Sequence, residues 1–321
     1  MAQRFRGGVV AATGTLTALL LAGHRLLPNW RGWGNTLDSA LPWLGLAVPL
    51  LAVAALARRS PLATAGVLVP AVTWGVMFGP AFVPAVRAGP PDLRVVHQNV
   101  NLANPDLPAT AKALRAARPD ILVAAELDDD PVLMNGTVDP AFAVRLDPGL
   151  RYRFPDNPGI AVWSRYPFVG RPRSVPGVPR SRWATIRTPH GPVNLYAVHL
   201  ASFRPGERWV IAERNAQVEA LAAAIRADPS PRIIVVGDLN TASTDREMGL
   251  LTETLSSAAE RAGSGMQFTW PASLPLVRLD HVLTRGFEVL DSRVLPRSVS
   301  DHRAILADLR FASSRKDEED R

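Results

Sequence analysis

The sequence predicts an α/β protein in which two mixed β-sheets pack face to face with helices outside, after an apolar segment that crosses a membrane. Residues 1–90 form three apolar stretches with seven arginines and a single acidic residue, Asp38. From Pro90 onward, short apolar runs alternate with amphipathic ones, and hairpin-like pairs occur beside helical connections, so a purely parallel sheet does not fit. We expect a membrane anchor at residues 1–90, a folded domain at residues 91–311 and a charged disordered tail at residues 312–321.

The N-terminal segment holds apolar stretches at residues 8–27, 41–57 and 62–86. Each approaches the roughly 20 residues that a helix needs to cross the hydrocarbon core of a bilayer. A cleaved signal peptide would account only for the first stretch, and a soluble helical domain would show polar faces that these stretches lack. We therefore expect three transmembrane helices that bind the chain to the lipid bilayer through residues 1–90.

The positions of the arginines favour a cytoplasmic N-terminus. Arg4 and Arg6 precede the first stretch, and Arg58 and Arg59 lie in the tight loop between the second and third. The first loop also holds two arginines, so the bias is shallow. Three crossings from an inside N-terminus predict a multi-pass cell-membrane protein whose residues 91 onward are extracytoplasmic.

The remainder of the chain is close to neutral, although the whole sequence has a formal net charge of +7. This balance argues mildly against tight nonspecific binding to nucleic acid, which needs many phosphate contacts. The chain has 0 cysteines, which excludes disulfides, iron–sulfur clusters and thiolate zinc sites.

Apolar periodicity gives the expected elements of the folded domain. Helices are predicted at residues 107–117 and 207–227, and strands at residues 93–99, 121–126, 160–164, 183–187, 193–199, 232–236, 279–283, 287–294 and 304–309.

Polar side chains stand where several of these strands end. Asn99 ends the first strand, and Glu126 ends a run of five apolar residues, where a carboxylate is costly unless a cation or donor meets it. In Gly237-Asp238-Leu239-Asn240 the Asp and the Asn are two residues apart and point to the same side of an extended chain. A plain Asx turn is the alternative for this last motif.

Two further motifs contain histidines. His302 follows Asp301, but neighbours on a strand face opposite ways, so His302 needs a different acid, and Asp280 offers one. The alternative for this motif is a turn cap. His199 ends another strand and either contacts a phosphate or is a satisfied core histidine. The other histidines, His24, His97, His190 and His281, receive no catalytic role, although His97 and His281 could line the site.

Carboxylates, amides and imidazoles without thiols suit a hard divalent cation and a phosphate ester. The order of these residues, together with the segment Gly159–Pro167, resembles the endonuclease/exonuclease/phosphatase superfamily of deoxyribonuclease I and exonuclease III, here as a membrane-anchored bacterial member. The resemblance covers about residues 92–311. Its residues are Asn99, Glu126, His199, Asp238, Asn240, Asp280, Asp301 and His302.

The resemblance implies a four-layer α/β sandwich and a Mg²⁺- or Mn²⁺-dependent hydrolase of phosphodiester bonds. By the same resemblance, Glu126 binds the metal with Asn99 and Asp301 close by. Asp238 orients or deprotonates the attacking water, and Asn240 holds the scissile phosphate. His302, oriented by Asp280, is a base or a transition-state stabiliser, and His199 binds the phosphate or assists the leaving group.

The substrate stays open between a nucleic acid and a lipid or inositol phosphate. An inactive, membrane-tethered binding or scaffold domain of the same fold is the alternative function. Leu239 stands where Phe is frequent in the superfamily, and Asn101 stands where some DNA-repair members carry Asp. The second departure weakens a repair-type interpretation.

The orientation has a direct test. Protease added to intact cells should degrade the part of the chain after residue 91, because the charge pattern places it outside the cytoplasm. A cytoplasmic protein serves as the control for cell integrity. Survival of the C-terminal part alongside that intact control would contradict the expected topology.

Overall fold

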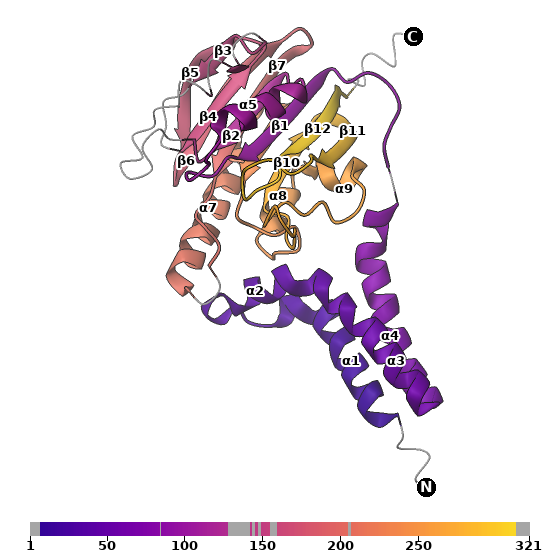
Figure 1. Ribbon diagram of the computed structural model, residues 1–321. Coiled ribbons are helices and arrows are strands. Elements are labelled where there is room, and N and C mark those ends of the chain that lie inside the picture. The colour runs from indigo at the N-terminus through magenta and orange to yellow at the C-terminus, as the bar shows by residue number, and fades with distance from the viewer. Residues whose placement is uncertain are drawn as a thin grey trace, which may run out of the picture. The chain divides into compact units, whose positions relative to one another are not determined.

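The computed structural model describes residues 7–312 except 84, 128–141, 143–144, 147–148, 155–158 and 205–206. The chain divides into two compact units (Figure 1). The first comprises the chain up to Val83 with the short segments 204–208 and 244–246, and the second comprises the rest. The acidic run at residues 128–130 and the tail beyond residue 312 lie outside the described residues.

The first unit is helical. Its longer helices are α1 (Gly8–Gly23), α2 (Trp33–Ala40), α3 (Ala47–Arg58) and α4 (Pro61–Phe78), and its short 3₁₀ segments are η1 (His24–Leu26), η2 (Trp30–Gly32), η3 (Leu41–Leu46) and η4 (Gly79–Phe82). By length and composition, three helical stretches could cross a membrane: Gly8–Leu26, Trp30–Arg58 and Pro61–Phe82. The three long apolar helices expected from the sequence are therefore present, and the second begins at Trp30 rather than Leu41.

The helices of this unit pack through small residues and expose apolar ones. A Cβ atom on Gly14 of α1 would lie 1.7 Å from the carbonyl oxygen of Gly66 on α4, so only glycine allows these helices to approach so closely. On the outer faces, Leu50, Leu56 and Val76 are 73%, 76% and 73% exposed. Apolar side chains spread over all three long helices are unfavourable in water and suit lipid.

The second unit contains two six-stranded mixed sheets (Figure 1). The first sheet has the order β11-β12-β1-β2-β4-β3 and the second the order β5-β6-β7-β8-β10-β9. The strands are β1 (Leu93–Asn99), β2 (Ile121–Ala125), β3 (Tyr152–Phe154), β4 (Ile160–Ser164), β5 (Phe168–Val175), β6 (Val178–Thr188), β7 (Gly191–His199), β8 (Ile233–Asp238), β9 (Ser256–Ser257), β10 (Asp280–Arg285), β11 (Phe287–Val294) and β12 (Ile305–Phe311). The expected pair of mixed sheets is confirmed.

Three apolar clusters hold the layers together. The central one lies between the sheets and includes Val95, Val123 and Ile186. Leu221 of α7 (Arg208–Ala227) packs on the outer face of the second sheet. Leu114 of α5 (Leu107–Ala116) packs on the outer face of the first. The layers therefore run helix, sheet, sheet, helix, and the short helices α8 (Met248–Thr252) and α9 (Ala258–Ala262) lie in the connections of the second sheet.

Among the described residues, two neighbouring strand pairs run parallel, and both lead into polar residues. β1 pairs with β2 in parallel, and β7 pairs with β8 in parallel. The remaining pairings are antiparallel. Because parallel strands end at the same edge of a sheet, the carboxyl ends of these four strands gather the side chains that follow them.

Gly237 is the tightest point of this arrangement. Its φ is +155°, and a Cβ atom there would lie 1.8 Å from the carbonyl oxygen of Val198 on β7. Glycine is therefore required for β8 to pair closely with β7 immediately before Asp238.

Substitution Gly237→Ala should destabilise the protein by at least about 2 kcal/mol, because neither the backbone conformation nor the neighbouring strand accommodates a methyl group. The measurement is the thermal unfolding midpoint of the full-length protein in detergent micelles. Gly249→Ala is the matched control, since the space beside Gly249 in α8 is open. Equal midpoints for the two variants would contradict this account of β8.

Candidate active site

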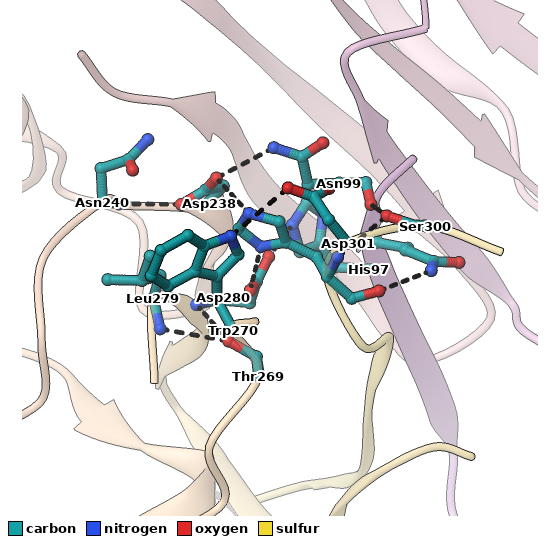
Figure 2. A network of polar contacts seen from close by, with 12 residues as sticks. His97, Asn99, Asp238, Asn240, Thr269, Trp270, Leu279, Asp280, Ser300 and Asp301 are labelled. Carbon is teal, nitrogen blue, oxygen red and sulfur yellow. Dashed lines mark hydrogen bonds and ion pairs between the residues drawn. The ribbon is translucent and has the colours of Figure 1, made fainter. Parts of the chain in front are cut away.

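The ends of both sheets converge on one group of polar side chains (Figure 2). In the first sheet Asn99 ends β1, and Glu126 follows the end of β2, which pairs in parallel with β1. In the second sheet His199 is in register with Asp238 across the parallel β7–β8 pair, and Asp280 is in register with Asp238 across the antiparallel β8–β10 pair. The site therefore draws its side chains from both sheets.

Asn99 joins the two sheets through its amide group. Its Nδ2 donates to Glu126 Oε1 at 2.9 Å and to Asp238 Oδ2 at 3.0 Å. Its Oδ1 accepts the backbone N–H of Asn101 at 3.0 Å. In this orientation Asn99 presents N–H groups to the two carboxylates. The orientation favours the role of holding Glu126 over direct ligation of a cation.

The expected Asp280–His302 pair is formed. His302 Nδ1 lies 2.8 Å from Asp280 Oδ2, and its Nε2 lies 3.8 Å from Asp238 Oδ2. Ser300 fixes the loop that carries His302, because its Oγ donates to the Asn99 carbonyl at 2.6 Å and accepts the backbone N–H of His302 at 3.0 Å. The Nε2 of His302 thus faces Asp238, while its Nδ1 is held by Asp280.

His199 and Asn240 complete the inner part of the site. His199 Nε2 lies 3.6 Å from Glu126 Oε1, and its buried Nδ1 has no hydrogen-bond partner among the residues that the structure describes. The backbone N–H of Asn240 donates to Asp238 Oδ1 at 2.9 Å. Its side-chain Nδ2 donates to the Leu200 carbonyl at 3.0 Å. Asn240 therefore lies directly beside Asp238.

Two of these residues have strained backbones. Glu126 has a φ of +57° and Asn240 a φ of +46°, a left-handed conformation that is uncommon for residues other than glycine. Such strain persists only where the surroundings enforce it, and it is concentrated at functional sites.

Asp301 occupies a different position from the other carboxylates. Its side chain is exposed, and Oδ2 accepts a hydrogen bond from Trp270 Nε1 at 3.3 Å. The sequence places Asp301 beside a metal with Asn99 and Glu126. In the structure those two contact each other, and the exposed Asp301 contacts Trp270 (Figure 2).

The electrostatics of the buried groups follow from their partners. Burial disfavours the charged imidazolium, but Asp280 and Asp238 outweigh it and raise the pKa of His302 to about 10. Burial raises the pKa of Asp238 to about 6. It lowers the pKa of His199 well below the usual value, with a further contribution from the charge of Arg180. At neutral pH the site then holds a carboxylate at Asp238, an imidazolium at His302 and a neutral His199.

The donor set fits a hard divalent cation. The Glu126 side chain is 26% exposed, and beside it lies the buried carboxylate of Asp238, so oxygen ligands face an accessible point. One potential ligand atom from each of Asp238, Asp280 and His302 lies within 4.8 Å of the other two, which also meets the spacing of a metal site. Asp280 is less suited to ligation, because each of its oxygens already accepts a hydrogen bond from an imidazole.

Sequence analysis gave His97 only a place lining the site, and it did not name Thr269. His97 Nε2 lies 3.0 Å from Asp280 Oδ1, so this histidine contacts the acid behind His302. Thr269 Oγ1 accepts the backbone N–H groups of Leu279 and Asp280 at 3.2 and 3.4 Å. The signal for His97 was available, since residues two apart on a strand share a face and His97 is two residues before Asn99.

A family model supports the assignment of the fold. Residues 96–302 match the model described as "Endonuclease/Exonuclease/phosphatase family". The chain therefore belongs to this family. A curated relative, a UPF0294 protein of Vibrio vulnificus, is 36% identical over 117 residues, which are 36% of this chain and 37% of the relative. The chain thus matches little more than a third of the length of that relative.

Solved structures share the fold at low sequence identity. D. rerio TDP2 in complex with a single-strand DNA product has a TM-score of 0.53 and 17% identity, covering 68% of this chain and 99% of TDP2. A mannosyl-6-phosphatase of Bacteroides thetaiotaomicron has a TM-score of 0.54 and 17% identity, covering 68% of this chain and 100% of its own. A Staphylococcus aureus beta toxin mutant with bound magnesium ions has a TM-score of 0.51 and 14% identity, covering 69% and 100%.

Because His281 is buried next to Asp280, we expect the stability of the folded protein to fall at acid pH. Burial lowers its pKa to about 3, with help from the charge of Arg278, whereas an unfolded histidine titrates near 6.5. Only the unfolded state gains a proton as the pH falls below about 6.5. The stability contributed by neutral His281 is therefore complete above pH 6.5 and is lost at about 1.4 kcal/mol per pH unit as the pH falls toward 3.

Substitution His281→Gln should flatten this dependence, because its amide can still donate to the Thr241 carbonyl that His281 contacts at 2.9 Å. Thermal unfolding of the full-length protein in micelles between pH 7.5 and pH 5 measures it. The exposed His190→Gln is the control and should keep the wild-type slope. A slope unchanged in His281→Gln would show that His281 does not carry the effect.

Proposed function

We propose that this protein is a membrane-anchored, divalent-metal-dependent phosphoesterase that hydrolyses phosphodiester bonds. The observation that carries the proposal is the convergence of Asn99, Glu126, His199, Asp238, Asn240, Asp280 and His302 at one edge of the sandwich. Membership of the endonuclease/exonuclease/phosphatase family supports the reaction class. Bound magnesium in the beta toxin structure supports the choice of Mg²⁺, with Mn²⁺ as the alternative.

Each residue has a role that its contacts favour. Asp238 is a carboxylate with a pKa of about 6, well placed to orient a water molecule and take its proton near neutral pH. His302 is an imidazolium that donates toward the same point and stabilises negative charge as it develops. Asn240 lies beside Asp238 and would hold the scissile phosphate.

Glu126 would hold the cation, Asn99 would keep the Glu126 carboxylate in place, and Asp301 would lie close by. The cation supplies Lewis-acid neutralisation of the phosphate oxygens when bound. Neutral His199 lies within reach of Glu126 and Asp238, and it would contact the phosphate or the leaving group.

The membrane anchor and the extracytoplasmic orientation remain part of the proposal. The apolar outer faces of the three N-terminal helices support insertion of residues 1–90 into a bilayer. The arginine pattern supports a cell-membrane protein with the catalytic domain, residues 91–311, outside the cytoplasm.

The substrate is a phosphoester, either nucleic acid or a lipid or inositol phosphate. TDP2 was crystallised with a DNA product, which supports the first class. An anchor that keeps the site near a bilayer supports the second. A panel of DNA, RNA, phospholipid and inositol phosphates would separate the two.

Turnover of bis-p-nitrophenyl phosphate by the full-length protein in micelles tests the proposed function. Activity should require Mg²⁺ or Mn²⁺, disappear with EDTA and return with added metal. Asp238→Asn and His302→Gln should each reduce kcat by about 10²–10⁴-fold, the range supplied by a positioned acid–base group or an electrostatic contact. His190→Gln, at the opposite end of β7 from His199, should leave the rate unchanged.

The competing function is an inactive binding or scaffold domain of the same fold. The complete set of polar contacts argues against it, because an unused set of buried carboxylates is costly to maintain. No turnover on the phosphoester panel, or equal rates in wild type and both active-site variants, would favour the scaffold.

A further inference from the structure

A histidine that faces the second sheet from β1 lies directly behind the Asp280–His302 pair. His97 is fully buried, with 0% of its surface exposed, and so is Asp280. The His97 ring bridges two elements: Nδ1 lies 3.1 Å from the carbonyl oxygen of Val123 on β2, and Nε2 lies 3.0 Å from Asp280 Oδ1 (Figure 2). Because the Val123 carbonyl and the Asp280 carboxylate are both acceptors, the ring donates to both only with a hydrogen on each nitrogen, and it then links a backbone group of one sheet to a carboxylate of the other.

The carboxylate of Asp280 is thereby clamped at both oxygens. Oδ1 contacts His97 Nε2 at 3.0 Å and Oδ2 contacts His302 Nδ1 at 2.8 Å. A carboxylate held at one oxygen can rotate about its Cβ–Cγ bond, whereas one held at both oxygens has a fixed plane. That plane sets the direction from which Asp280 meets the His302 ring.

We propose that His97 is a positioning residue, which fixes the plane of the Asp280 carboxylate and through it the orientation of His302 toward Asp238. Among the residues that the structure describes, His97 hydrogen-bonds with Val123 and Asp280 and not with His302 or Asp238, so it acts through Asp280. The chain of contacts runs from the Val123 carbonyl through His97 and Asp280 to His302. This inference rests on the proposed hydrolytic function only for its effect on rate.

The β-sheet backbone holds the Val123 carbonyl rigidly in place. Val123 is in register with His97 across the parallel β1–β2 pair, and both strands lie inside the first sheet. The carbonyl that receives Nδ1 is therefore held by the ladder itself, which is the most precise kind of support for a side chain in a site.

Two substitutions separate the two contacts of His97. The amide nitrogen of Asn can reach the position of Nδ1, so His97→Asn keeps a donor for the Val123 carbonyl and loses the contact with Asp280. The amide nitrogen of Gln can reach the position of Nε2, so His97→Gln keeps a donor for Asp280. Both replacements are polar and similar in size, which makes them a matched pair. Val95→Ala, a core substitution in the same strand, controls for loss of stability alone.

Steady-state kinetics of the full-length protein in micelles gives the first readout. His97→Asn should lower kcat by about 10–100-fold with little change in KM, the usual cost of removing a residue that orients a functional side chain. His97→Gln should restore most of kcat. Val95→Ala should keep the wild-type kcat even where its unfolding midpoint falls.

The second readout does not need turnover. In ¹⁵N-histidine-labelled protein, the N–H of His302 that faces Asp280 should give a downfield proton resonance, identified by its loss in His302→Gln. The resonance should vanish or broaden in His97→Asn and persist in His97→Gln and Val95→Ala.

The outcomes are distinct. Wild-type kcat and an intact resonance in His97→Asn would overturn the positioning role, as would equal losses of kcat in His97→Asn, His97→Gln and Val95→Ala. If the wild type hydrolyses nothing on the phosphoester panel, the proposed function fails, and the resonance alone decides on His97.

Discussion

Two buried carboxylates of the second sheet are stabilised by donors that the first sheet supplies. Asp238 and Asp280 stand in register on neighbouring strands, and both are almost fully buried. β1 provides Asn99 for one and His97 for the other, through hydrogen bonds of 3.0 Å each. Burying a carboxylate without such donors costs too much free energy for the fold to tolerate. The two sheets must therefore pack together for the site to form.

This requirement explains where the apolar core stops. The inward face of β1 begins with Leu93 and Val95, which belong to the cluster between the sheets, and continues with His97 and Asn99. One strand face therefore changes from core to site with no break in its pairing. The polar side chains are therefore carried by the same rigid backbone as the core. Gly237 lets β8 lie close to β7, which places Asp238 beside these side chains.

Sequence patterns predicted the strands with continuous apolar runs and missed strands whose side chains are mostly polar or exposed. Residues 168–175 form β5 although arginines and a proline interrupt any apolar run, because its side chains are mostly exposed at one edge of the second sheet. In the site, the strand ends predicted that Asn99, Glu126 and Asp238 lie together, and hydrogen bonds join them, since periodicity fixes where such side chains point. Asp301 lies in a loop before β12, where periodicity gives no direction, and it contacts Trp270 instead of Asn99 or Glu126. The orientation of the Asn99 amide likewise depends on its partners in space.

The charge of the pocket gives a further reason to favour a divalent cation. The carboxylates of Glu126, Asp238 and Asp280 lie in the site with the positive charge of His302. A phosphodiester brings another negative charge, and in a buried site two like charges repel strongly. A divalent cation offsets this negative charge more strongly than a monovalent one does. Glu126 is the accessible ligand of the three, because its side chain is 26% exposed whereas Asp238 and Asp280 are buried.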